Sequence, residues 1–207
     1  MGLGEPIGAL TASLTGWLQG MREGSIVILA IIMGLMLAFD MGGPVNKVAY
    51  AFMLICVSQG VYSVVAIAAV GIAVPPLGMG LATLIGRKYF SAEERETGKA
   101  ALVMGCVGVT EGAIPFAAAD PLRVIPANMI GAAAGCVTAA LLGAQCYAGW
   151  GGLIVLPVVE GKGGFIAGLA VGAIVSAACV ILLKALAKKK ASDAKADDEM
   201  DLDFEIN

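Results

Sequence analysis

The sequence contains no histidine, which excludes histidine acid–base chemistry, histidine metal sites and a phosphohistidine within the chain. Only 14% of the 207 residues are charged, and 59% are hydrophobic. A soluble globular domain has about 25% charged and roughly 45–50% apolar residues. The five cysteines form no Cys-x-x-Cys pair, and we interpret them as small buried hydrophobic residues. The composition favours a membrane protein over a soluble enzyme, and it indicates no metal site and no cofactor.

Long stretches without any charged residue locate the expected membrane segments. These stretches are 48–86, 124–159 and 163–183. A helix that crosses a bilayer needs about 20 apolar residues, so the first two exceed one span and the third fits one. A shorter apolar stretch precedes them, and Pro75-Pro76 is expected to break the chain. The predicted helical segments are 25–39, 48–70, 77–86, 124–144 and 164–183.

Basic residues near the ends of the spans predict the orientation. Cytoplasmic loops are enriched in lysine and arginine, so the charged loop 87–99 and the segment that begins at Lys184 are both expected in the cytoplasm. An even number of crossings must separate them. Two spans after residue 124 satisfy this if residues 100–121 enter and leave on one side as a re-entrant hairpin. We therefore predict an all-α membrane protein with about five transmembrane helices and a re-entrant hairpin.

The chain divides into three predicted parts. Residues 1–24 form an amphipathic N-terminal helix, because their apolar side chains fall on one helical stripe. Residues 25–187 form the membrane-embedded domain. Residues 188–207 are basic first and then acidic, and we expect a disordered charged tail, the alternative being a docking tail for a partner.

Short motifs predict local structure within the membrane-embedded domain. Small residues four apart, as in Gly131/Gly135 and Gly168/Gly172, predict close packing between helices. Ser91 followed by Glu94 predicts a capping box at a helix start.

Glu111 is the sharpest candidate for chemistry. It lies in an apolar segment broken by Gly112 and Pro115, and a carboxylate at membrane depth is costly and usually functional. Such a carboxylate can accept hydrogen bonds from ligand hydroxyl groups or act as a base toward one of them. The alternative is a structural ion pair with Arg123 or Lys47.

Two further polar clusters are candidates for ligand contact. In the first, Asp120 and Arg123 could pair across the turn at Pro121, with Asn128 one turn further on. In the second, Asp40, Asn46 and Lys47 surround Gly42-Gly43-Pro44, where glycines allow a ligand to approach the backbone. Lys47 could attract an anionic phosphate. The alternatives are a structural ion pair for the first cluster and an ordinary interhelical loop for the second.

Three strings in the sequence resemble the membrane (IIC) domain of fructose-type phosphotransferase permeases. They are FDMGGPVNKVAYAF, PPLGMGLATLIGRKYF and GVTEGAIPFAAADPLRVIPANMIG. The resemblance implies a homodimer that binds a fructose-like sugar and carries it inward, where the phosphocysteine of a IIB domain, charged by a IIA phosphohistidine, phosphorylates it. It also implies that Glu111 contacts the sugar and that the GGPVNK and DPLR strings line or support the same site.

The sequence departs from this family in three respects. It resembles only the C-terminal part of a IIC domain, so the N-terminal spans are expected on a separate chain, unless the sequence is a truncated product. It carries no IIA or IIB sequence, so the phosphoryl donor must belong to a partner. Where the family often has Pro-His-Gly-Gly, the chain reads Gly149-Trp150-Gly151-Gly152. A tryptophan can stack on a sugar face but cannot perform imidazole chemistry.

The sequence thus predicts the membrane component of a phosphoenolpyruvate-dependent sugar phosphotransferase system. We expect a multi-pass protein of the bacterial inner membrane with a cytoplasmic C-terminus, and no nucleic-acid partner. The alternatives are a half-length assembly or regulatory subunit and a sugar facilitator without phosphorylation. Glu111 is the predicted catalytic residue. The predicted substrate-binding residues are Glu111, Thr110, Asn46, Lys47, Gly42, Gly43, Asp120, Arg123 and Trp150.

Overall fold

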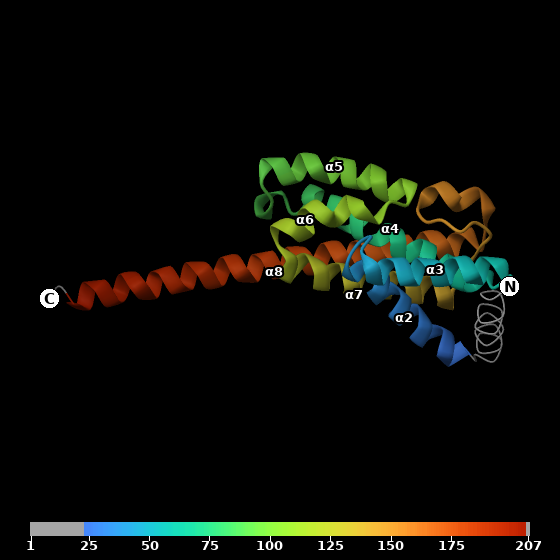
Figure 1. The fold of residues 1–207 in the computed structure, drawn as a ribbon. Helices are drawn as coiled ribbons and strands as arrows, with labels where there is room; N and C mark the ends of the chain where they lie inside the picture. Colours follow the sequence, from blue (N-terminus) through green and yellow to red (C-terminus); the bar gives the residue numbers. More distant parts are fainter. Residues whose placement is uncertain (1–22, 206–207) are drawn as a thin grey trace, which may run out of the picture.

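The computed structural model describes residues 23–205, with side chains described for 26–189, and the chain is mostly helical (Figure 1). Most of the predicted amphipathic helix 1–24 lies outside the described residues. The α-helices are α2 (Glu23–Phe39), α3 (Pro44–Ser58), α4 (Tyr62–Ile85), α5 (Ala92–Val107), α6 (Ile114–Ala119), α7 (Pro121–Leu141) and α8 (Lys162–Glu205). Short 3-10 helices connect them: η1 (Arg87–Tyr89), η2 (Thr110–Ala113) and η3 (Leu153–Val158). Two short antiparallel strands, β1 (Gln145–Cys146) and β2 (Val159–Glu160), lie between α7 and α8.

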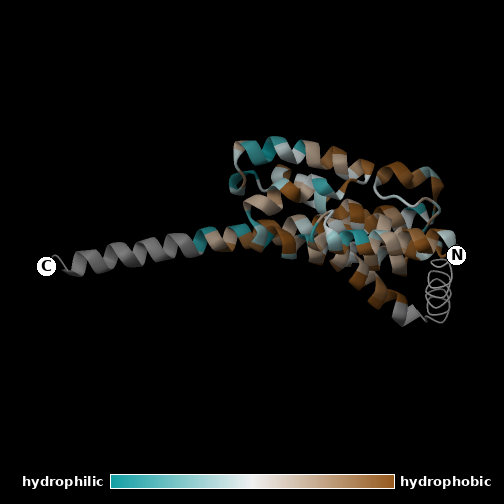
Figure 2. Ribbon diagram, in the orientation of Figure 1, coloured by the Kyte–Doolittle hydropathy of each residue, from teal (hydrophilic) through white to brown (hydrophobic). Residues whose placement is uncertain are grey.

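Helix α4 lies at the centre of the bundle. It packs against α2, α3, α5, α7 and α8. Its most apolar stretch is 89% buried by other parts of the chain, whereas those of α7 and α8 are 44% and 39% buried. These three helices are long and apolar enough to cross a membrane, and α2 and α3 are shorter apolar helices. Hydrophobic residues cover most of the bundle, while hydrophilic residues gather at the end where α5 begins (Figure 2). The predicted all-α class is confirmed.

The predicted helix 48–70 is wrong, because two helices share this stretch. Helix α3 ends at Ser58, and Gly60 adopts a left-handed conformation with φ of 73° before α4 begins. Glycine reaches this conformation without the steric cost that a side chain brings. The predicted break at Pro75-Pro76 is also wrong, since both prolines lie inside α4. The periodicity of an apolar run does not locate such boundaries, because every residue in it is suited to burial.

The predicted glycine packing between helices is confirmed for α7 and α8. A side chain on Gly135 would lie 2.7 Å from the carbonyl oxygen of Gly168, and one on Gly168 would lie 2.8 Å from that of Gly135. One turn along the pair, a side chain on Gly172 would lie 3.1 Å from the carbonyl oxygen of Gly131. Glycines therefore face each other across the contact, and the two backbones approach as closely as small residues permit.

The two predicted cytoplasmic segments lie at the same end of the bundle. The predicted capping box at the start of α5 is confirmed, since Ser91 and Glu94 exchange hydrogen bonds between side chain and backbone. The Glu94 carboxylate also pairs with Lys184 of α8 at 2.9 Å. Beyond this contact α8 projects from the bundle and continues as a helix to Glu205 (Figure 1). It thus runs through most of the segment 188–207, for which the sequence predicts disorder.

Candidate functional site

One pocket gathers most of the predicted substrate-binding residues. It has a volume of about 230 Å³ and lies between the start of α3, the middle of α4 and the turn that follows α5. Glu111, Thr110, Lys47, Asn46, Gly42 and Trp150 all line it. The remaining lining residues are Tyr50, Ile72 and Gly108. Segments far apart in the sequence therefore meet around one cavity.

The loop before α3 is shaped by Asp40. Its two carboxylate oxygens accept hydrogen bonds from the backbone N–H groups of Val45 (2.7 Å) and Asn46 (2.9 Å). These N–H groups belong to the first turn of α3, where backbone N–H groups find no acceptor within the helix. The carboxylate therefore caps the helix and complements its dipole. This cap fixes where Lys47 enters the pocket.

The side chain of Asn46 mainly stabilises the fold. Its side chain is buried, and its amide nitrogen donates a hydrogen bond of 2.6 Å to the carbonyl oxygen of Leu37. The side-chain oxygen retains its capacity to accept a hydrogen bond. Lys47 is exposed, and no described residue forms a hydrogen bond or ion pair with its side chain. Lys47 therefore presents to the pocket a cation that has no partner among the side chains of residues 26–189.

The turn that carries Glu111 is anchored by Thr110. The buried Thr110 hydroxyl donates a hydrogen bond of 3.0 Å to the carbonyl oxygen of Ile72 in α4. That carbonyl would normally bond the N–H of residue 76, but Pro76 has none. The proline therefore creates an acceptor in the middle of α4, and the threonine satisfies it.

The side chain of Glu111 is exposed. None of the hydrogen bonds or ion pairs among the side chains of residues 26–189 involves its carboxylate. The carboxylate lies against Gly42, where an added Cβ would be 2.7 Å from Oε1 of Glu111. The structural ion pair with Arg123 or Lys47, which was the alternative to a functional role, is absent from the described part of the chain. The carboxylate is thus free to accept hydrogen bonds from a ligand.

Trp150 forms one wall of the pocket and is held from two sides. Its indole N–H donates a hydrogen bond of 2.7 Å to the carbonyl oxygen of Val107. Its ring meets Tyr50 edge to face, with the centroids 6.4 Å apart. The Tyr50 hydroxyl in turn donates to the carbonyl oxygen of Gly149 at 3.0 Å. Two aromatic rings in fixed positions offer the apolar surface on which a sugar ring stacks.

Three predicted residues lie outside this pocket. Asp120 and Arg123 form the predicted ion pair at 2.9 Å, but they line a different pocket beside Lys88 and Lys184. Gly43 is the N-cap residue of α3 and is not among the residues that line the pocket of Glu111. The structure does not bring these three to Glu111.

Asn128 also has a place in the fold rather than in the pocket. It is fully buried and accepts a hydrogen bond of 2.7 Å from Ser176 of α8. Its amide nitrogen points at the sulfur of Met41, at 3.8 Å. Asn128 therefore joins α7 and α8 to the loop between α2 and α3, which contains Met41.

Sequence reasoning missed Tyr50, Ile72 and Gly108. Tyr50 could have been found, because it lies four residues after Asn46 and three after Lys47, on the same face of a helix. Gly108 ends α5 in a left-handed conformation with φ of 84°, and a side chain there would meet the backbone of Gly151. Ile72 gave no signal, since it sits in an unbroken apolar run.

Comparison with known proteins identifies the relatives of the chain. It is 80% identical over all 207 residues to the fructose-like permease IIC component 2 of Escherichia coli, of which it covers 58%. It is 39% identical over 197 residues to the PTS system fructose-specific EIIC component of Haloferax volcanii, covering 52% of that protein. It is 46% identical over 184 residues to the PTS system fructose-specific EIIB'BC component of Xanthomonas campestris, covering 32%. The chain is homologous to the IIC components of fructose-type phosphotransferase permeases.

The predicted resemblance is confirmed by these identities. The IIC homologue spans little more than half the length of the IIC relatives reported above. No family model matches the chain, and no solved structure matches it. The pocket described above is lined by residues from the motifs around Gly42, Glu111 and Trp150. The alignment with the Escherichia coli protein covers every residue of the chain and therefore includes the whole pocket.

Proposed function

We propose that this IIC homologue is the membrane component of a phosphoenolpyruvate-dependent phosphotransferase system, and that it binds a fructose-like sugar in the pocket of Glu111. The observation that carries the proposal is the exposed Glu111 carboxylate in a pocket with Lys47 and two fixed aromatic rings, where neither charged group has a partner among the side chains of residues 26–189. A carboxylate binds sugar hydroxyls as an acceptor, and the rings of Tyr50 and Trp150 suit the apolar face of a sugar. The relatives named as fructose permeases support this class of ligand.

The proposed chemistry is a phosphoryl transfer to a sugar hydroxyl. The phosphocysteine of a IIB domain on another chain supplies the phosphoryl group, so the S–P bond breaks as the O–P bond to the sugar forms. The cysteine leaves as a thiolate, and Glu111 accepts the proton from the attacking hydroxyl. Lys47 stabilises the negative charge of the transferring group. The chain itself contributes positioning and proton acceptance, and the donor residue belongs to the partner.

The topology that we propose follows from the arrangement of the basic residues. The end of the bundle that carries Glu94, Lys184 and the Asp120–Arg123 pair faces the cytoplasm of a bacterial inner membrane, together with the C-terminus. The segment from α5 to α6 leaves this end and returns to it as a re-entrant hairpin, with Glu111 near its tip. Helices α4, α7 and α8 cross the membrane, α2 and α3 enter it as shorter apolar helices, and two copies assemble as a homodimer.

The test is phosphoenolpyruvate-dependent sugar phosphorylation by membranes that carry the chain, supplied with the soluble phosphotransferase proteins and a matching IIB domain. Glu111→Gln should abolish phosphorylation with unchanged expression, while Glu93→Gln, which removes an exposed carboxylate of α5 outside the pocket, should leave it intact. Activity that appears only when an N-terminal IIC fragment is added shows that these residues need the rest of a IIC domain for sugar phosphorylation. Equal activity of Glu111→Gln and the unmodified chain would contradict the proposed role of Glu111.

A further inference from the structure

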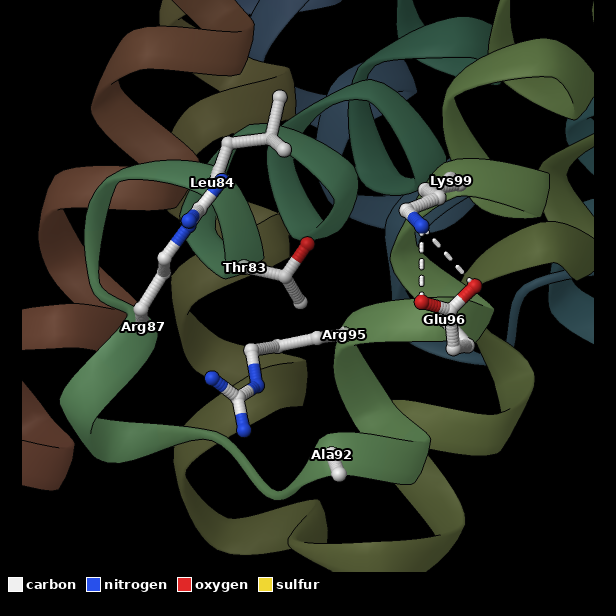
Figure 3. Close-up of a pocket in the computed structure, with 7 residues that line it drawn as sticks. All are labelled: Thr83, Leu84, Arg87, Ala92, Arg95, Glu96 and Lys99. Atoms are coloured by element: carbon white, nitrogen blue, oxygen red, sulfur yellow. Dashed lines mark hydrogen bonds and ion pairs between the residues drawn. The ribbon is translucent and has the colours of Figure 1, made fainter.

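A second pocket lies at the opposite end of α5 from Glu111. It has a volume of about 320 Å³ and forms where α4 ends and α5 begins (Figure 3). Its lining residues are Thr83, Leu84, Arg87, Ala92, Arg95, Glu96 and Lys99. Arg95 lies 12 residues before the end of α5 at Val107, which places the two pockets roughly 18 Å apart along the helix axis. The pocket is thus separate from the proposed sugar site.

Close packing of α5 on α4 makes this pocket a fixed feature of the fold. The buried Thr83 side chain occupies the position that a side chain on Gly98 would need. One turn toward the bundle centre, Leu102 occupies the corresponding position beside Gly80. The start of α5 is also fixed by its capping box and by the ion pair between Glu94 and Lys184. The cations on the first turns of α5 therefore have a defined position relative to the end of α4.

The pocket carries an excess of positive charge. Arg87, Arg95 and Lys99 line the pocket with a single carboxylate, that of Glu96, which pairs with Lys99 at 2.7 Å, while Arg87 reaches toward Leu84 (Figure 3). The side chain of Arg95 is directed toward the loop after η1, where its Nε donates to the carbonyl oxygen of Ser91 at 3.2 Å (Figure 3). Among the side chains that the structure describes (residues 26–189), no anionic group pairs with either arginine. Two guanidinium groups without a counter-ion in that range therefore remain at the pocket.

The pocket also adjoins exposed apolar surface at the end of a membrane-length helix. Leu84 is 44% exposed and Ile85 is 68% exposed, and they form the last turn of α4. The arginines therefore lie at the depth where the hydrocarbon core gives way to the polar headgroups, if α4 crosses the bilayer. Guanidinium groups match phosphate in charge and in the geometry of their paired donors.

We propose that Arg87 and Arg95 form a binding site for the phosphate group of an anionic phosphate ester. Two sources offer this chemistry: the headgroup of an anionic phospholipid, whose acyl chain would lie along Leu84 and Ile85, and a soluble phosphate ester on the cytoplasmic side. Binding requires both arginines, because Lys99 is already neutralised by Glu96.

The experiment measures ligand binding to the full-length chain purified in a non-ionic detergent. Phosphatidylglycerol retention is counted by native mass spectrometry, and diacylglycerol with the same acyl chains serves as the reference without phosphate. Glycerol 3-phosphate is titrated in parallel and followed by thermal shift. The variant Arg87→Gln/Arg95→Gln is compared with Lys88→Gln/Lys188→Gln, which removes the same charge at the same end of the bundle but lines the neighbouring pocket of Arg123.

The proposal expects the arginine variant to bind the phosphate ligand roughly tenfold more weakly, while the lysine variant binds like the unmodified chain. Retention of phosphatidylglycerol without binding of glycerol 3-phosphate identifies a lipid site, and binding of both identifies a site for the phosphate group itself. Equal loss in the two variants, or retention unchanged in the arginine variant, overturns the proposal. Circular dichroism of both variants establishes that they are folded, and the measurement does not depend on sugar phosphorylation.

Discussion

The hydroxyl of Thr110 donates its hydrogen bond to the carbonyl oxygen of Ile72, a residue 38 positions earlier in the chain, at a distance of 3.0 Å. The acceptor is available because Pro76 cannot donate to it. The proline in the central helix therefore leaves a carbonyl free, and the turn that carries Glu111 binds to it through Thr110. This bond links the centre of the bundle to the carboxylate that we propose binds the sugar.

Replacement of Thr110 by valine should expose the importance of this bond. Thr110→Val keeps the shape of the side chain but leaves the buried Ile72 carbonyl without its donor, which costs about 1–3 kcal/mol. The thermal unfolding temperature in detergent should fall, and that of Thr110→Ser, which retains the hydroxyl, should fall less. Equal stability of the valine variant and the unmodified chain would show that the bond contributes nothing.

Gly42→Ala should disturb the sugar site through direct contact. The added Cβ would lie 2.7 Å from Oε1 of Glu111, and the backbone φ of 107° is unfavourable for alanine. Sugar phosphorylation should fall strongly. Gly60→Ala is the matched control, because its φ of 73° is also positive but no atom lies within 4 Å of the added Cβ. Gly60→Ala should lose about 1–2 kcal/mol of stability and keep its activity. An equal loss of activity in Gly42→Ala and Gly60→Ala would argue against a role for the contact between Gly42 and Glu111.

Removal of the Asp40 cap should loosen the start of α3. Asp40→Ala takes away acceptors from two backbone N–H groups and should destabilise the protein by about 0.5–2 kcal/mol. Because the cap fixes the first turn of α3, which carries Lys47, hydrogen exchange at residues 41–47 should accelerate before that of α4. Asp40→Asn keeps one acceptor, so its stability should lie between that of the unmodified chain and that of Asp40→Ala. Uniform exchange across both helices would contradict a local role.

Trp150 should tolerate phenylalanine better than alanine. Trp150→Phe preserves an aromatic surface beside Tyr50 and loses only the hydrogen bond to Val107, whereas Trp150→Ala removes the surface itself. If the ring stacks on the sugar, the alanine variant should bind roughly tenfold or more weakly, since an aromatic contact contributes about 0.5–1.5 kcal/mol beyond the area that it buries. Calorimetry measures the sugar affinity of both variants, and an alanine variant that binds as tightly as the phenylalanine variant would contradict stacking on the ring.

The contact between Tyr147 and Glu160 should be visible in an alkaline titration. The Tyr147 hydroxyl donates to Glu160 at 2.7 Å, and this hydrogen bond, with the negative charge beside it, raises the pKa of Tyr147 above its usual value near 10. The stabilisation is complete below that value and is lost as the pH rises through the higher pKa of the folded protein. Glu160→Gln should lower the tyrosinate absorbance midpoint assigned to Tyr147 by comparison with Tyr147→Phe. An unchanged midpoint would contradict this assignment.

The sequence predicted the features that depend on local chemistry. The capping box of Ser91 and Glu94, the facing glycines of α7 and α8, and the pairing of Asp120 with Arg123 all follow from residue type and spacing. These interactions involve neighbours in the chain or the sterics of small residues. They are therefore readable without knowledge of the tertiary structure.

Features that depend on tertiary contacts escaped prediction. The continuity of α4 through Pro75-Pro76 requires a donor from Thr110, which the chain brings from a distant turn. The separation of Asp120 and Arg123 from the pocket of Glu111 depends on the path of α6, which returns them to the other end of the bundle. The role of Ile72 arises only when α4 is placed beside that turn, whereas the spacing of Tyr50 from Asn46 and Lys47 already placed it on the same helix face.

The burial of α4 has a consequence for how the protein is made. The ribosome synthesises α4 before α5, α7 and α8, so most of the α4 surface that these helices later cover lacks its packing partners at first. Until Thr110 is synthesised, the Ile72 carbonyl opposite Pro76 lacks the hydroxyl donor that it has in the folded chain. Synthesis order therefore leaves an interval in which the central helix is incomplete, and that interval ends with the arrival of the turn that carries Glu111.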